Sequence, residues 1–173
     1  MKKEIYTKRL YLRPLQVTDL PSTHAYAGNP ENTKYMMYLP NENIHETERF
    51  LRKVAIEWEK ENPSFYEFAV VREGAHMGAV SLCSNGNAEW ELGWILHKDF
   101  WGKGYVVEAV EALLPFAIKE LGAKRFVAHC DAENTASRRV MEKIGMRLFS
   151  DEGTRYNKGS KIQTKELIYC LEE

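Results

Sequence analysis

The stretch Glu89–Leu121, EWELGWILHKDFWGKGYVVEAVEALLPFAIKEL, decides the fold of this chain. Its first part, Trp90–His97, is apolar and rich in aromatic residues, which predicts a strand. Two glycines, Gly102 and Gly104, come next, and apolar residues then recur at helical spacing. Free backbone N–H groups and the helix dipole converge where such a helix begins. The stretch therefore predicts an anion site for a phosphate, with Lys103 as an added cation.

Two familiar phosphate-binding patterns do not fit this loop. A P-loop requires Gly-x-x-x-x-Gly-Lys-Ser/Thr, and no glycine or hydroxyl here has that spacing. A dinucleotide fingerprint requires a third glycine or alanine at position 107, where the chain has Val107. Two glycines alone are a weak pattern, so a plain strand-to-helix turn remains the alternative.

Length and composition suit a single globular domain. The chain has 173 residues, of which 44% are hydrophobic, and its net charge of −1 offers no general attraction to nucleic acid or anionic membrane. The charged start lacks the apolar run of a signal peptide, and no later stretch could span a bilayer. The three cysteines, Cys83, Cys130 and Cys170, lie in apolar strand-like contexts, which predicts reduced core thiols. We expect a cytoplasmic protein without a nucleic-acid or membrane partner.

The remaining segments read as further strands and helices of one α/β domain. The expected strands are Thr7–Pro14, Phe65–Arg72, His76–Cys83, Arg125–Asp131, Arg147–Ser150 and Lys165–Leu171. The expected helices begin near Thr18 and span His45–Glu61 and Asn134–Ile144. The segments Asn29–Asn43 and Ser150–Lys165 are expected to be loops.

A second strand-to-helix unit, Asp131–Met146 (DAENTASRRVMEKIGM), follows the first. Asn134 suits a helix N-cap, and Ser137 falls three residues later in the first turn. Simple capping would explain Asn134 on its own. Two successive units of this kind, however, place two helix N-termini at the carboxyl ends of strands, where α/β sheets bind ligands.

Three runs of the chain resemble the Gcn5-related N-acetyltransferase (GNAT) superfamily. They are Glu91–Ala109 (ELGWILHKDFWGKGYVVEA), Asn134–Met146 (NTASRRVMEKIGM) and Thr7–Pro14 (TKRLYLRP). Within the superfamily, the chain looks like the RimJ/RimL-like branch, which acetylates ribosomal-protein N-termini. The resemblance spans nearly the whole chain and implies one N-acetyltransferase domain over residues 1–173.

The resemblance implies an α/β (α+β) fold with a twisted mixed sheet of about six to seven strands and about four flanking helices. The fourth and fifth strands, Trp90–His97 and Arg125–Asp131, would splay apart, and acetyl-CoA would lie in the split. By position, the cofactor-binding residues are Trp94, Ile95 and Leu96 on the strand, Trp101, Gly102, Lys103, Gly104, Tyr105, Val106 and Val107 on the loop, and Asn134, Ser137, Arg139 and Lys143 on the second helix.

Each group of cofactor-binding residues has an expected part of acetyl-CoA. The strand backbone and Asn134 would hold the pantetheine, and the Gly102–Val107 amides would hold the pyrophosphate. Ser137 would lie beside the thioester sulfur. Arg138, Arg139 or Lys143 could help to bind the adenine end and the 3′-phosphate.

Three residues depart from the superfamily pattern. Trp101 stands where the loop usually begins with Arg or Gln, and Val106 stands where Gly or Ala is usual. A β-branched residue is unfavourable at positive φ but harmless in an ordinary first turn of a helix. Met141 replaces the tyrosine that serves many members as general acid, so Ser137 is the better candidate for a proton donor.

The reaction needs a base, because only a neutral amine attacks a thioester. Alternation along the strand places Glu89, Glu91 and His97 on one face and the aromatic residues on the other. Glu91 matches the position of the family's strand-four glutamate, so we expect it to act as base, directly or through water. The alternative is a solvated strand carboxylate, which is the commoner role of glutamate.

Two other chemistries are not supported by the sequence. His129, Cys130 and Asp131 are adjacent on a strand, so Cys130 points away from the other two and a covalent thiol mechanism is disfavoured. The five histidines lack the spacing of zinc ligands, so we expect no metal.

The sequence thus predicts an acetyl-CoA-dependent N-acetyltransferase that acts directly on a primary amine, with a protein N-terminus as the expected acceptor. An aminoglycoside or polyamine acetyltransferase and a non-catalytic CoA-binding regulator are the alternatives.

The acceptor would enter between Asn29–Asn43 and Ser150–Lys165, and Glu67 or Glu91 could hold its cation. The resemblance also allows a homodimer. Expected lining residues are Tyr35, Tyr38, Phe65, Tyr66 and Tyr156.

Overall fold

One mixed sheet runs through the protein, whose computed structural model describes residues 4–172. Residues 1–3 and 173 of the expected domain lie outside this description. The strand order is β1-β2-β3-β4-β5-β6-β8-β7. The strands are β1 (Ile5–Tyr6), β2 (Tyr11–Pro14), β3 (Phe65–Arg72), β4 (Ala75–Gly86), β5 (Glu89–Leu96), β6 (Arg125–Asp131), β7 (Arg147–Asn157) and β8 (Ile162–Glu172).

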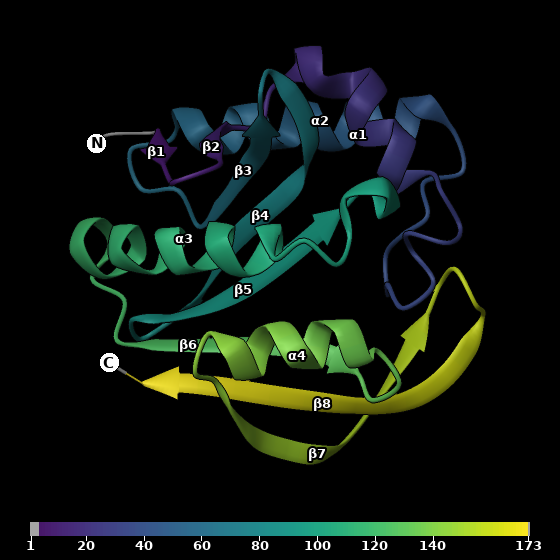
Figure 1. The fold of residues 1–173 in the computed structure, drawn as a ribbon, viewed down its shortest axis with the longest axis vertical. Helices are drawn as coiled ribbons and strands as arrows, with labels where there is room; N and C mark the ends of the chain where they lie inside the picture. Colours follow the sequence, from purple (N-terminus) through teal and green to yellow (C-terminus); the bar gives the residue numbers. More distant parts are fainter. Residues whose placement is uncertain (1–3, 173) are drawn as a thin grey trace.

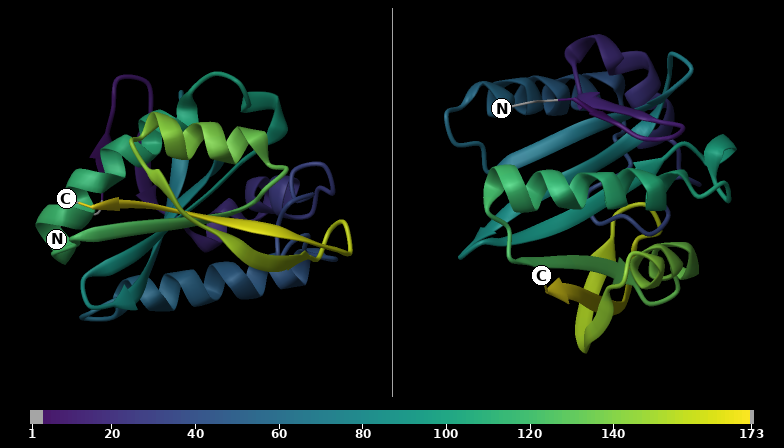
Figure 2. Two further views of the ribbon diagram at one scale, coloured as in Figure 1. Left: turned by 90° about the horizontal axis from the view of Figure 1, so that it is seen from below. Right: turned by 60° about the vertical axis from the view of Figure 1, so that its left-hand side comes forward.

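Helices cover both faces of this sheet. They are α1 (Leu20–Ala27), α2 (Ile44–Glu59), α3 (Tyr105–Leu121) and α4 (Thr135–Lys143), with short 3₁₀ turns at Val17–Asp19 and Lys98–Phe100. Figure 1 shows α3 and α4 in front of the sheet, and Figure 2 shows α2 on the opposite side. Every neighbouring pair of strands is antiparallel except β5 and β6, which are parallel and joined through α3.

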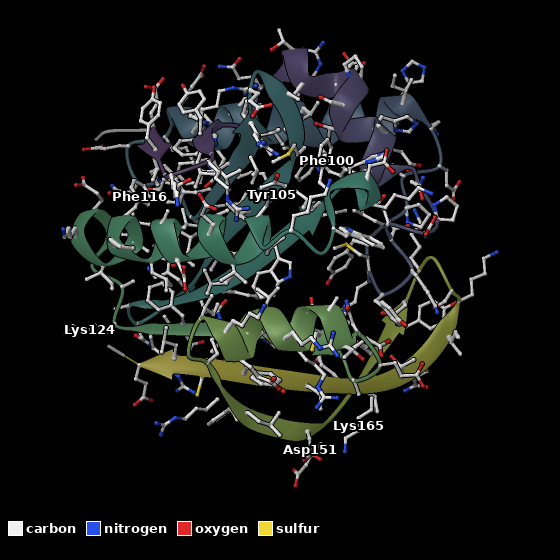
Figure 3. All side chains as sticks on the ribbon, in the orientation of Figure 1. Phe100, Tyr105, Phe116, Lys124, Asp151 and Lys165 are labelled. Atoms are coloured by element: carbon white, nitrogen blue, oxygen red, sulfur yellow. The ribbon has the colours of Figure 1, made fainter. Side chains whose placement is uncertain are left out.

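The apolar stripe of α3 packs against the sheet as its periodicity predicts. Val110, Leu113 and Ala117 are fully buried. The ring of Phe116 on α3 (labelled in Figure 3) contacts the ring of Phe68 on β3 edge-on, at 5.4 Å between centroids. On β5, Trp90, Leu92 and Leu96 are buried, which confirms the predicted apolar face of that strand. This packing fixes the start of α3 at the end of β5.

The fold class is confirmed, but the sheet has more strand than expected. Thr7–Pro14 is not one strand: a turn closed by the Thr7 N–H and the Leu10 carbonyl (2.9 Å) separates β1 from β2. The expected loop Ser150–Lys165 is mostly β7 and β8, which pair as a long hairpin. Figure 3 shows Asp151 and Lys165 on these neighbouring strands, and their side chains form a 2.6 Å ion pair. Within residues 4–172, eight strands therefore replace the expected six to seven.

The cysteines do not all lie in the core. Cys130 is buried, as predicted, but Cys83 is exposed and Cys170 is partly exposed. The prediction was wrong for Cys83 because its side chain lies on the face of β4 that is not covered at that position. All three are free thiols.

Candidate active site

The sheet splits between β5 and β6. The two strands pair over three positions, the last of which joins Glu91 to Val127. β5 then continues to Leu96 and β6 to Asp131, and Figure 1 shows the two strands diverging in that direction. The predicted splay of these two strands is therefore confirmed.

The register of β4 and β5 decides which backbone groups of β5 face the split. The His97 N–H donates to the Met77 carbonyl at 2.8 Å, and bonded positions alternate along an antiparallel pair. The backbone of Ile95 therefore points toward β4, and the N–H and C=O groups of Trp94 and Leu96 point into the split. This register narrows the predicted strand contacts of a pantetheine to Trp94 and Leu96.

The carbonyl of Leu96 is already engaged at the end of β5. It accepts hydrogen bonds from the Asn32 amide (2.6 Å) and from the indole Nε1 of Trp101 (2.7 Å). Asn32 also accepts a hydrogen bond from the Lys98 N–H at 3.2 Å. Of the two residues Trp94 and Leu96, Trp94 keeps both its backbone N–H and its C=O directed into the split, whereas the C=O of Leu96 is already hydrogen-bonded.

The glycine loop leads directly into α3. Gly102 and Gly104 adopt positive φ angles of 74° and 76°, and Gly104 is the N-cap of the helix. The Glu108 N–H donates to the Gly104 carbonyl at 3.1 Å, so the preceding N–H groups have no partner within the helix. These belong to Tyr105, Val106 and Val107. They are the unpaired N–H groups that the sequence predicts at the start of this helix.

Val106 lies in the first turn of α3 and is not among the described non-glycine residues with positive φ. The β-branched side chain is therefore compatible with this position. It packs, partly buried, against the core. The departure from Gly or Ala at this point does not distort the loop.

Arg9 fixes the loop from the β1–β2 turn. Its Nε donates to Glu108 Oε2 at 2.6 Å and its Nη1 donates to the Lys103 carbonyl at 3.0 Å. Thr7 Oγ1 also donates to Glu108, at 2.6 Å. Burial alone would raise the pKa of Glu108, but these hydrogen bonds hold it below its usual value. The sequence reasoning missed this clamp because its partners are far apart in the chain.

The N-terminus of α4 meets β5 at the other side of the split. Asn134 caps the helix, and its Oδ1 accepts a hydrogen bond from the Ser137 N–H at 3.1 Å. The Trp94 indole Nε1 donates to Ser137 Oγ, also at 3.1 Å. Met141, one turn later, is completely buried in the core. A tyrosine-like proton donor is therefore absent at that position, as the sequence shows.

A small pocket of about 130 Å³ lies where β5, β6 and α4 meet. Its volume is well below that of a site for a whole drug-sized ligand. It is lined by Tyr35, Met36, Glu91, Leu92, Gly93, Trp94, His129, Cys130, Asn134, Ser137 and Arg155. The two predicted catalytic residues, Glu91 and Ser137, thus share one pocket. Arg139 and Lys143 lie outside it, exposed on α4.

Charged residues of β7 and β8 lie at the pocket and beside it: Arg155 lines it, and Glu166 lies next to Arg155. The Arg155 guanidinium donates from Nε to Asn157 Oδ1 (3.1 Å) and from Nη2 to the Tyr35 carbonyl (3.1 Å). Its Nη1 lies 3.5 Å from Glu166 Oε1, and Glu166 Oε2 lies 3.5 Å from His129 Nδ1. The sequence reasoning missed Arg155 and Glu166, because it placed Arg155 in a loop and had no signal for their pairing.

The two segments expected to flank the acceptor entrance contact each other. The Lys158 N–H, at the tip of the β7–β8 hairpin, donates to the Met36 carbonyl at 3.0 Å. Tyr35 lines the pocket. Tyr38, on the first of the two segments, and Tyr156, on the second, are exposed. Tyr66 cannot line it, because its ring is buried in the core against Trp58, at 5.0 Å between centroids.

Two further groups, Cys130 and Glu67, bear on the chemistry. Burial raises the pKa of the Cys130 thiol to about 11, which makes it a poor nucleophile and agrees with the rejection of a thiol mechanism. Burial also raises the pKa of Glu67 to about 8, and Glu67 does not line the pocket.

Within residues 4–172, no three His, Cys, Asp or Glu side chains gather as metal ligands would. The same residues include no helix that is long and apolar enough to cross a membrane.

A family model for the acetyltransferase (GNAT) domain matches residues 9–147. The chain belongs to the GNAT acetyltransferase family. This GNAT chain is 31% identical over 144 residues to YnaD of Bacillus subtilis (strain 168), described as an uncharacterized N-acetyltransferase; the match covers 83% of this chain and 82% of YnaD.

Solved structures share the GNAT fold over nearly the whole chain. A GNAT acetyltransferase from Bacillus anthracis superposes with a TM-score of 0.78 at 28% identity, covering 98% of each chain. RimL, described as a ribosomal L7/L12 alpha-N-protein acetyltransferase in complex with coenzyme A, superposes with a TM-score of 0.85 at 18% identity, covering 98% of this chain and 97% of RimL. At that identity, the likeness to RimL shows the fold alone.

Proposed function

We propose that this GNAT acetyltransferase transfers the acetyl group of acetyl-CoA directly to a primary amine, with a protein N-terminal amine as the acceptor. The observation that carries the proposal is that Glu91, Asn134 and Ser137 line one pocket at the point where β5 and β6 part. A base and a proton donor then lie on opposite sides of the reacting atoms.

The residues of the split fit coenzyme A. The free N–H groups at the start of α3 suit a pyrophosphate, because a helix N-terminus favours negative charge. The backbone N–H and C=O of Trp94 suit an amide of the pantetheine arm. Arg139 and Lys143 lie exposed on α4, where a 3′-phosphate could reach them. When bound, acetyl-CoA supplies an activated acetyl thioester.

Glu91 and Ser137 divide the proton chemistry in this proposal. Glu91 accepts a proton from the acceptor ammonium, directly or through water, since the neutral amine is the nucleophile. Ser137 donates a proton to the leaving sulfur and regains one of the protons that the acceptor nitrogen loses. The indole N–H of Trp94 is a donor only, so it occupies a lone pair of Ser137 Oγ and leaves the serine hydrogen free to point into the pocket.

The charges of the pocket favour a protein N-terminus over a polycationic small amine. One carboxylate, Glu91, and one guanidinium, Arg155, line the pocket, and the second nearby carboxylate, Glu166, is paired. A site for an aminoglycoside or a polyamine would need several unpaired carboxylates. The fold shared with RimL, whose description names a protein acceptor, agrees with this choice.

Acceptor profiling by mass spectrometry tests the proposal. Purified enzyme and acetyl-CoA are offered a mixed library of peptides, the same peptides with blocked N-termini, aminoglycosides and polyamines. We expect acetylation of free peptide N-termini and no reaction of the blocked peptides. Acetylation of the small amines alone would support the alternative acceptor, and acetyl-CoA binding without transfer to any amine would support a non-catalytic regulator. The cytoplasmic location and the homodimer remain predictions of the sequence.

A further inference from the structure

His129 lies across the split from Glu91. β5 and β6 are parallel, and the pair Glu91–Val127 shares one register position. Paired residues point to the same face and every second residue keeps that face, so His129 and Glu91 project from the same side of the sheet. Both side chains line the pocket that contains Ser137.

Glu166 on β8 lies beside the imidazole of His129. Its Oε2 lies 3.5 Å from His129 Nδ1, and β6 and β8 are hydrogen-bonded neighbours. The Glu166 side chain is 15% exposed and also faces Arg155 Nη1 at 3.5 Å. A carboxylate beside Nδ1 favours the tautomer with its hydrogen on Nδ1. The opposite nitrogen, Nε2, is then free to accept a proton.

The acceptor nitrogen loses two protons when an ammonium is converted into an amide. The ammonium loses one proton before its nitrogen bonds to the acetyl carbon, and the nitrogen loses a second as the C–S bond breaks and the amide forms. The sulfur gains one proton from Ser137, one of the two protons lost by the nitrogen replaces it on Ser137, and the other leaves to solvent. A single carboxylate that has taken the first proton cannot take the second until it has released it.

We propose that His129, oriented by Glu166, accepts one of the two protons that the acceptor nitrogen loses, opposite Glu91, which accepts the other. This inference rests on the proposed amine acetyltransferase activity. In this inference the Glu91 carboxylate and the His129 imidazole act differently on the acceptor nitrogen. An anionic carboxylate attracts an ammonium but stabilises its charged form, whereas a neutral imidazole accepts a proton without that opposing attraction.

The groups around His129 are compatible with this role. Glu166 on β8 stabilises the imidazolium that forms, and Arg155 on β7 faces Glu166 from the other side. Glu91, on β5, lines the same pocket as His129. On β6 itself, Asp131 is already held by Thr164 Oγ1 (2.7 Å) and Asn157 Nδ2 (2.5 Å) and does not compete for the imidazole.

Steady-state kinetics of His129→Gln and Glu166→Gln test the inference, with His45→Gln as the matched control. His45 is an exposed histidine on α2, outside the pocket. A positioned general base contributes on the order of 10²-fold or more, so we expect kcat of His129→Gln to fall by about that factor with little change in acetyl-CoA binding. We expect an intermediate loss for Glu166→Gln and no change for His45→Gln.

Two readouts separate proton transfer from a structural role. The kcat of the wild type should rise with pH as an imidazole loses its proton, and His129→Gln should lack that limb. Added imidazole should restore activity to His129→Ala. Wild-type kcat and an unchanged pH profile in His129→Gln would overturn the inference, as would a loss that imidazole does not restore. Because these outcomes require an active wild type, they differ from failure of the proposed function, in which the wild type transfers no acetyl group.

Discussion

The indole Nε1 of Trp94 on β5 donates a 3.1 Å hydrogen bond to Ser137 Oγ on α4. Trp94 comes from the strand that carries Glu91, and Ser137 comes from the helix that Asn134 caps. This bond ties the two sides of the pocket together. It also sets the direction of the serine hydroxyl, because the indole cannot accept a hydrogen bond.

Replacing Ser137 with alanine should lower kcat without lowering affinity for acetyl-CoA. The proton donor to the leaving sulfur is lost, and proton transfer of this kind contributes on the order of 10²-fold. Thiol release from acetyl-CoA at saturating substrate measures the effect. An unchanged kcat would show that the Ser137 hydroxyl donates no proton in the reaction.

Trp94→Phe is the companion variant. It keeps the aromatic packing and removes the N–H that orients Ser137, so we expect a smaller loss of kcat, about tenfold or less. If Trp94→Phe loses as much activity as Ser137→Ala, the indole has a larger role than orientation. Thermal unfolding of both variants should stay close to that of the wild type.

Gly104→Ala should weaken coenzyme A binding, whereas Gly122→Ala should not. Both glycines have positive φ, 76° at the N-cap of α3 and 66° at its C-cap, so each substitution should cost about 1–2 kcal/mol of stability. Relief of that strain at position 104 displaces the N–H groups proposed to hold the pyrophosphate. We expect about a tenfold rise in Kd for CoA in Gly104→Ala alone, by calorimetry. Equal effects of the two variants would contradict the assignment of the loop.

The sequence predicts the glycine loop, α3 and the cap of α4 well, because each of them depends on local patterns. The two glycines, the apolar period of α3 and the cap at Asn134 are each set by neighbouring residues, and the structure places them as expected. The alternation along β5 likewise follows from strand geometry. The motifs at these positions then extend the prediction to the family, which the comparison confirms.

Arg139 and Lys143 should contribute to CoA affinity through the 3′-phosphate. Both are exposed on α4, and exposed ion pairs contribute about 0.2–1 kcal/mol, so each alanine variant should raise Kd for CoA by up to about fivefold. The Kd for 3′-dephospho-CoA should not change. Lys53→Ala, on α2 at the opposite face of the sheet, is the control. Equal weakening of both ligands would place the 3′-phosphate elsewhere.

Glu67→Gln should flatten the pH dependence of stability. Burial raises the pKa of Glu67 to about 8 from an ordinary value of 4.5, so between these pH values the folded protein holds a proton that the unfolded chain has lost. Stability from this group is fully present below pH 4.5 and is lost as pH rises toward 8. Thermal unfolding from pH 5 to 8 measures the slope. A slope equal to that of the wild type would contradict the neutral state of Glu67.

The interactions that sequence reasoning missed are all long-range. Arg155 lies in a polar segment with Gly153, Asn157 and Gly159, which favours a loop by composition, and its strand appears only when β8 is there to pair with it. The pairing of Glu166 with His129 requires the register of β6 and β8. No local pattern predicts such contacts, because they depend on which strands become neighbours.

Thiol release from acetyl-CoA by wild type, Glu91→Gln and Glu89→Gln tests the central claim most directly, using a peptide with a free N-terminal amine. Glu89 lies two residues earlier on the same face of β5 but pairs with Arg125 at 3.5 Å outside the pocket. We predict amine-dependent release by the wild type and by Glu89→Gln, and a loss on the order of 10²-fold or more in Glu91→Gln. Release that does not depend on the amine, or an undiminished rate in Glu91→Gln, would contradict acetyl transfer at this split.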